Sequence, residues 1–173
     1  MNEKHKKYLR KQLLYNFLIN GILNGIIAYF MNLNKSAQLE AYTMQENRVN
    51  LIIDIAITAI IFAWLIAWSI NSSSKQAGVY ASIKPANKFQ TWMGKWFRIP
   101  ARYGWIWCIA VVPALFLVTL LGLEIFNVTK FTLWGWTLYK TGYTAVMGAV
   151  FAYIFIKSAA YGDYAYLVKW KKG

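Results

Sequence analysis

Three asparagines recur at intervals of four residues early in the chain, at Asn16, Asn20 and Asn24, and Gly21 and Gly25 lie beside them. On a helix the asparagines form one polar stripe, while the glycines form a smooth stripe about 100° round the helix axis. A G-x-x-x-G spacing lets the backbone of another helix approach closely, either in this chain or in a second copy. Two such stripes in so apolar a segment indicate contact with protein or water.

The polar stripe supports three interpretations. Side-chain amides can hydrogen-bond across helices and contribute about 0.6 to 2 kcal/mol each, so the stripe can hold a bundle together. Alternatively, three amides stacked about 6 Å apart can replace the hydration shell of a small solute or ion. Thr58, in a second apolar segment, would lie level with Asn24 along that path. The third interpretation is a binding site for lipid.

Charged residues at the edges of apolar segments form a second group of candidates. Residues 55–70 and 141–156, which follow Asp54 and Lys140, are uncharged runs that give helices about 24 Å long, shorter than a hydrocarbon core of about 30 Å. Both charges, together with Glu124 at the end of another apolar segment, are therefore expected near the outer boundary of the membrane. Since an intramembrane charge usually finds a partner, we expect an Asp54 to Lys140 ion pair. The alternative is that both side chains snorkel to the interface.

Residue types that enzyme chemistry needs are scarce. His5 is the only histidine, the acidic residues are scattered singly, and Cys108 lies inside an apolar segment without a plausible base. No glycine-rich phosphate loop follows a strand. We therefore expect no enzymatic activity, no metal site and no cofactor.

Four apolar segments must position these residues. A hydrophobic content of 58% over 173 residues is too high for an ordinary soluble domain. About 20 mostly apolar residues cross a bilayer, and the segments of this length are residues 13–32, 51–70, 103–123 and 138–156. The connections between them leave no room for a soluble domain. The sequence therefore predicts an all-α polytopic membrane protein, a bundle of four transmembrane helices that forms one domain over residues 1–173.

The distribution of positive charge predicts the topology. The net charge is +13, and basic residues gather before the first span, between the second and third spans, and after the fourth. The other two connections are close to neutral. The positive-inside rule therefore places both termini in the cytoplasm, in agreement with an even number of spans, and the cytoplasmic (plasma) membrane is the expected location. Topology and attraction to anionic lipids at the cytoplasmic face explain the charge, and no nucleic-acid binding is expected.

Residues 87–98 place aromatic and basic side chains at helical spacing, which predicts a short amphipathic helix in the headgroup plane. Asn87 can cap its start, and Pro100 stops it before the third span. We expect this helix either to anchor the chain in the membrane or to dock a partner or acidic lipid headgroups. The residues expected to contact lipid or a partner are Lys88, Trp92, Lys95, Trp96 and Arg98.

Small residues of the second span, Ala59 and Ala63, give it a smooth face that is expected to meet Gly21 and Gly25 of the first. The expected function is transport-related: binding or passage of a small solute or ion along the asparagine stripe, in a homo-oligomer packed through the glycines. The alternative is a non-catalytic accessory or regulatory subunit of a larger membrane complex. In that case the two stripes and the basic aromatic helix would hold the partner.

Overall fold

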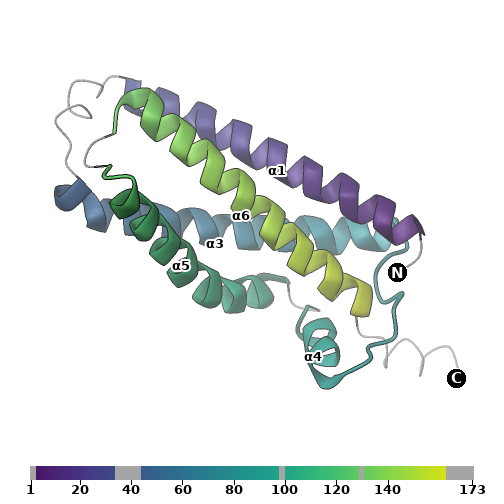
Figure 1. The fold of residues 1–173 in the computed structure, drawn as a ribbon. Coiled ribbons are helices and arrows are strands. Elements are labelled where there is room, and N and C mark those ends of the chain that lie inside the picture. Colours follow the sequence, from purple (N-terminus) through teal and green to yellow (C-terminus); the bar gives the residue numbers. More distant parts are fainter. Residues whose placement is uncertain (1–2, 34–43, 98–99, 129–130, 163–173) are drawn as a thin grey trace, which may run out of the picture.

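The structure, a computed structural model, describes residues 3–33, 44–97, 100–128 and 131–162. These residues form five helices and no strand, so the all-α prediction is confirmed for the described part of the chain. The helices, labelled as in Figure 1, are α1 (Glu3–Asn32), α3 (Met44–Gln76), α4 (Lys88–Trp96), α5 (Pro100–Ile125) and α6 (Leu133–Tyr161).

Four of these helices contain stretches that are long and apolar enough to cross a membrane: Glu3–Asn32, Ile53–Gln76, Tyr103–Ile125 and Leu133–Tyr161. Each apolar segment that the sequence predicts lies within one of the four long helices. The helices run past the predicted boundaries because backbone hydrogen bonding continues into the polar residues that flank each apolar run.

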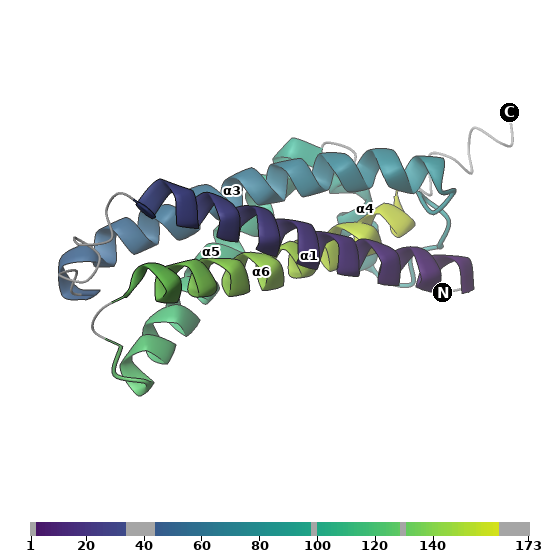
Figure 2. The same cartoon turned by 90° about the horizontal axis from the view of Figure 1, so that it is seen from above.

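The four long helices pack in the order α1, α6, α3, α5 (Figures 1 and 2). Helix α6 is an inner helix that contacts both α1 and α3, whereas α1 packs mainly on α6 and α5 mainly on α3. Helices α3 and α6 end, and α1 begins, at the end of the bundle that holds α4 (Figure 1). We call this the α4 end, and the opposite end the far end.

The aromatic part of the hydrophobic core lies in the half of the bundle next to α4. Phe151 and Phe155 of α6 are buried and stack with ring centroids 5.6 Å apart. Phe155 also contacts Tyr103 of α5, with ring centroids 5.7 Å apart. The hydroxyls of Tyr103 and Ser158 are hydrogen-bonded at 2.6 Å, so the buried phenol is satisfied. Burial of these rings holds α5 and α6 together at this end.

The glycines of α1 pack against α6, which corrects the expectation that they meet the alanine face of α3. A Cβ atom at Gly21 would lie 2.9 Å from the Cβ of Ala145, and one at Gly25 would lie 2.1 Å from the Oγ1 of Thr141. The expectation assumed that the first two spans are neighbours in the bundle. Instead, α6 is the neighbour of α1, because it presents small side chains opposite the glycines.

The alanine face of α3 instead packs against α5. A Cβ atom at Gly104 would lie 3.1 Å from the backbone oxygen of Ala63, and the Sγ of Cys108 donates to the carbonyl of Ala59 at 3.3 Å. Ala59 and Ala63 are both fully buried. Small residues on each of these helices therefore permit the close approach of α3 and α5.

Helix α4 begins as predicted, because the side chain of Asn87 accepts a hydrogen bond from the backbone N–H of Gln90 at 2.9 Å. Part of its apolar face is covered by the bundle, although the Phe89 side chain is 58% exposed. Met93 is buried, and a Cβ atom at Gly94 would lie 2.1 Å from the carbonyl oxygen of Gly162, at the end of α6. The short helix is therefore docked against the end of the bundle.

This docking partly covers two of the predicted contact residues. Trp92 and Trp96 are half-buried and pack against the hydrophobic core, and Trp92 lies 6.3 Å from Tyr103 between ring centroids. The bundle thus covers part of each indole, and contact of their exposed parts with lipid or a partner stays a prediction. Lys88 and Lys95 are exposed, as a lipid or partner contact requires, and Arg98 lies outside the described residues.

Candidate functional site

An ion pair joins α3 and α6 in the far half of the bundle. The Nζ of Lys140 contacts Oδ1 of Asp54, which places the two predicted partners side by side. Only 10% of the Lys140 side chain is exposed, whereas 29% of the Asp54 side chain is. The carboxylate is thus the more accessible member of the pair.

Neighbouring hydroxyls complete the hydrogen bonding of both charges. The hydroxyl of Tyr143 donates to Oδ2 of Asp54, and the Nζ of Lys140 also donates to Oγ1 of Thr58 at 3.3 Å. The same ammonium lies 5.6 Å from the centroid of the Tyr143 ring. Asp54 and Thr58 are one turn apart on α3, and Lys140 and Tyr143 are one turn apart on α6, so each helix presents two polar groups to the other. We call these four residues the ion-pair site.

Glu124, the third member of the predicted outer charged cluster, lies on a different helix. It is in the last turn of α5, and its side chain is exposed. Within the described residues, no group of three His, Cys, Asp or Glu side chains is arranged to hold a metal ion. The ion-pair site itself contains one carboxylate, one ammonium and two hydroxyls.

The asparagine stripe of α1 donates hydrogen bonds along its own helix. The Nδ2 of Asn16 donates to the carbonyl of Gln12 at 2.8 Å, that of Asn20 to Asn16 at 2.7 Å, and that of Asn24 to Asn20 at 2.8 Å. Each amide therefore bonds the carbonyl one turn earlier, in the manner of a polar side chain that back-bonds within a helix.

Helix α6 covers this stripe closely. A Cβ atom at Gly148 would lie 2.6 Å from the Nδ2 of Asn20 and 2.9 Å from the carbonyl oxygen of Asn16. The Oγ1 of Thr144 lies 3.2 Å from the carbonyl oxygen of Asn20 and 2.7 Å from that of Lys140. The stripe and its covering helix are thus in direct contact, with no space for a solute between Gly148 and Asn20.

Thr144 also connects the stripe to the ion-pair site. Its hydroxyl is fully buried and lies within hydrogen-bonding distance of carbonyls on both α1 and α6. Since Thr144 is one turn after Lys140, the polar groups of α1, α6 and α3 form one layer across the bundle. The structure brings Asn20, Asp54, Thr58 and Lys140 into this layer from three helices.

Tyr143, Thr144 and Gly148 were not singled out as site residues from the sequence. Tyr143 and Thr144 stand three and four residues after Lys140, on the helix face that Lys140 presents. That spacing was the signal that could have found them. Gly148 follows Thr144 by one further turn and faces the same helix as the asparagine stripe.

A comparison of the chain with models of protein families, with curated proteins and with solved structures finds no match.

Proposed function

We propose that this chain is a non-catalytic, transport-related integral membrane protein that binds a small cation at the ion-pair site. Its termini and α4 face the cytoplasm, and the ion-pair site faces the opposite side of the membrane. The basic residues at the start of α1 and around α4 support this orientation, because positive charge is retained on the cytoplasmic side. The cytoplasmic membrane is the corresponding location.

The observation that carries the proposal is the Lys140 to Asp54 ion pair between two apolar helices. A buried ion pair stabilises a protein little, since removing two charges from water costs as much as their attraction returns. In a membrane-spanning helix that cost is larger still, and ionisable residues there usually mark the path or site of a ligand. The ion pair is therefore better explained by ligand binding than by stability.

The oxygen atoms of the site define the ligand class. Asp54 supplies a carboxylate that holds the Lys140 ammonium, and Thr58 supplies a hydroxyl oxygen that accepts from the same ammonium. The Tyr143 hydroxyl, which donates to the second carboxylate oxygen, lies at the other side of Asp54. A small cation such as sodium, potassium or ammonium would take the place of this ammonium, since hard cations prefer oxygen ligands. Entry would be from the far end, where the Asp54 side chain is partly exposed.

The asparagine stripe supports the proposal as packing. Its amides bond their own helix, and Gly148 lies against Asn20, so α1 and α6 form a closely packed pair beside the site. Under this proposal, a cation replaces the Lys140 ammonium at Asp54 and thereby alters the packing of α6 against α3. Helix α1 moves together with α6.

The second candidate function is that of an accessory subunit, and the edge position of α5 favours it. Helix α5 packs on α3 and touches α4, and its other face exposes apolar side chains, among them Ile109, Leu117 and Val118. A second membrane protein, or another copy of this chain, could cover that face. The ion pair would then hold α3 and α6 in the geometry that the partner requires.

A thermal unfolding series tests the first candidate. The purified protein in lipid nanodiscs is heated in sodium, potassium, ammonium or methylammonium chloride, with N-methylglucamine chloride as the reference at equal ionic strength. Ligand at about 100 times Kd stabilises the folded state by about 2.7 kcal/mol, which raises Tm by several degrees. At least one cation should do so in the wild type.

Asp54→Asn should abolish that rise. Glu124→Gln is the matched control, since it removes an acidic charge from the same half of the bundle outside the ion-pair site, and it should retain the rise. If no cation stabilises the wild type, or if Asp54→Asn responds as the wild type does, cation binding at this site is wrong. A foreign membrane protein that copurifies in fixed stoichiometry would then support the accessory role.

A further inference from the structure

The acceptors around the Lys140 ammonium define the kind of cation that the ion-pair site suits. Its Nζ contacts Oδ1 of Asp54 and donates to Oγ1 of Thr58 at 3.3 Å. The same Nζ lies 5.6 Å from the centroid of the Tyr143 ring, within the range of a cation–π interaction. An ammonium group has three N–H donors. The site therefore offers these donors two side-chain oxygens and one aromatic face.

An alkali cation fits this set of acceptors less well. Among the described residues, Asp54 and Thr58 supply the oxygens bonded to the ammonium, whereas the Tyr143 hydroxyl donates its proton to the other carboxylate oxygen. Sites that hold a bare alkali cation replace its hydration shell with a ring of oxygens. Two oxygens replace only part of that shell. An ammonium ion, in contrast, regains through directed N–H donors the hydrogen bonds that it loses in water.

A ligand ammonium can replace that of Lys140 without leaving the carboxylate unpaired. The Asp54 side chain is partly exposed, which gives a ligand access to it. The flexible stem of a lysine can stay along apolar surface while its charged end moves out to the membrane boundary. Asp54 has an ammonium beside it before and after such an exchange, so the high cost of an isolated charge in the membrane is avoided.

We infer that the ion-pair site binds an ammonium ion with free N–H groups, NH₄⁺ or a short primary alkylammonium, in preference to sodium or potassium. The inference rests on the proposed function and names the class of cation. Asp54 neutralises the ligand, Thr58 accepts one of its N–H groups, and the Tyr143 ring faces its positive charge. Lys140 is a tethered competitor that occupies the site until the ligand replaces it.

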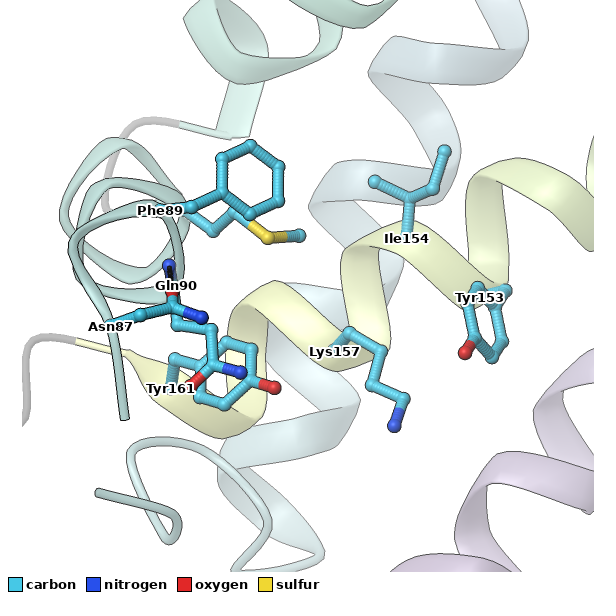
Figure 3. Close-up of a pocket in the computed structure, with 8 residues that line it drawn as sticks. Asn87, Phe89, Gln90, Tyr153, Ile154, Lys157 and Tyr161 are labelled. Atoms are coloured by element: carbon cyan, nitrogen blue, oxygen red, sulfur yellow. Dashed lines mark hydrogen bonds between the residues drawn. The ribbon is translucent and has the colours of Figure 1, made fainter. Parts of the chain in front are cut away.

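A second lysine of α6 provides a contrast to Lys140. Lys157 lies over the ring of Tyr153, with its Nζ 5.7 Å from the ring centroid. Both residues line a hollow of about 240 Å³ between α4 and the end of α6, at the α4 end of the bundle (Figure 3). A lysine over a tyrosine ring thus occurs on this helix apart from Asp54. Tyr153 is therefore a control position for loss of the Tyr143 ring.

Binding midpoints of the full chain in lipid nanodiscs test the inference. The rise of Tm is followed against the concentration of methylammonium, potassium or tetramethylammonium chloride, with N-methylglucamine chloride making up a constant ionic strength. Methylammonium should reach its midpoint at about one tenth of the potassium concentration, a preference of about ten-fold. Tetramethylammonium carries the same charge but no N–H group, and it should give no rise.

Substitutions that remove one acceptor each should weaken methylammonium binding. Thr58→Val removes the hydroxyl and should raise the midpoint about five-fold. Thr137→Val is its control, because Thr137 is equally buried, with 8% exposed, and its hydroxyl donates to the carbonyl of Leu133 on its own helix. Tyr143→Leu removes the aromatic face and should also raise the midpoint about five-fold. Tyr153→Leu should leave it unchanged.

Chemical rescue of Lys140→Ala tests the same acceptors without the tethered competitor. n-Propylammonium supplies the atoms that this substitution removes, and it should raise the Tm of the variant more than potassium does at equal concentration. Equal midpoints for potassium and methylammonium in the wild type would overturn the inference and leave cation binding intact. An equal rise with tetramethylammonium would overturn it too, since N–H donors would then have no role. If no cation stabilises the wild type, the proposed function itself is wrong, even where n-propylammonium rescues Lys140→Ala.

Discussion

The backbone of Gly148 lies against the side chain of Asn20, so close that a Cβ atom on Gly148 would come within 2.6 Å of Nδ2. This contact joins an inner helix, α6, to the polar stripe of α1. It shows why the stripe can be polar inside an apolar helix: the amides bond their own backbone, and a glycine on the partner lets the helices close over them.

Substitution of Gly148 by alanine should therefore destabilise the bundle. The added methyl would force Asn20 or the backbone of α1 to move, at a cost of about 1 to 3 kcal/mol for overpacking. Gly142→Ala on the same helix is the control, because a Cβ atom there meets nothing within 4 Å. That variant should be neutral or stabilised by up to about 1 kcal/mol. Equilibrium unfolding in bicelles measures both, and equal stability of the two variants would contradict the close packing.

A double-mutant cycle should reveal the energetic coupling of Asp54 and Lys140. Asp54→Asn and Lys140→Gln each leave one charge without its partner and should cost about 1 to 3 kcal/mol. This is less than the 3 to 5 kcal/mol typical of fully buried pairs, because 29% of the Asp54 side chain is exposed. The double variant should lose less folding free energy than the sum of the two single variants, with a coupling of about 1 kcal/mol or more.

The variant with exchanged charges, Asp54→Lys with Lys140→Asp, should be better folded than either of its single variants. Additive losses would show that the ion pair has no energetic role.

Substitution of Gly94 should release α4 from the bundle. A Cβ atom at Gly94 would lie 2.1 Å from the carbonyl oxygen of Gly162, so alanine cannot fit without separating the two segments. Hydrogen exchange of Lys88–Trp96 should become faster by at least ten-fold, while α3 and α6 keep their protection. Thr91→Ala, at an exposed position of the same helix, should leave exchange unchanged. Unaltered exchange in Gly94→Ala would argue against this docking.

The proposed orientation can be tested with single cysteines. In a Cys108→Ala background, Lys88→Cys should react with a membrane-impermeant maleimide only from the cytoplasmic side. Phe126→Cys, 79% exposed in the wild type just beyond α5, should react only from the other side. The reverse pattern would invert the topology, and labelling of both positions from one side would refute four complete spans.

The sequence predicts the spans and the ion pair because both depend on local quantities. The length of an apolar run determines where a helix can cross a bilayer, and the short runs after Asp54 and Lys140 place both charges at one depth. Equal depth on two helices was enough to predict their contact, although it said nothing of Tyr143 or Thr58.

The neighbours of each helix were harder to predict. Gly21 and Gly25 indicate that some helix can approach closely, but Ala63 and Ala145 are equally small partners. The pattern of Trp92 and Trp96 has the same ambiguity, because an amphipathic helix looks alike whether its apolar face meets lipid or protein. The contact of Gly94 with Gly162, which docks this helix on the bundle, joins residues that are far apart in the sequence, so no local pattern predicts it.

An infrared difference spectrum of the protein with and without a cation tests the central claim most directly, because it observes the carboxylate itself. Addition of the cation that raises Tm most should shift the carboxylate stretching band in the wild type and in Glu124→Gln, and Asp54→Asn should show no such shift. A shift that persists in Asp54→Asn, or a wild-type spectrum that does not change, would contradict cation binding at Asp54.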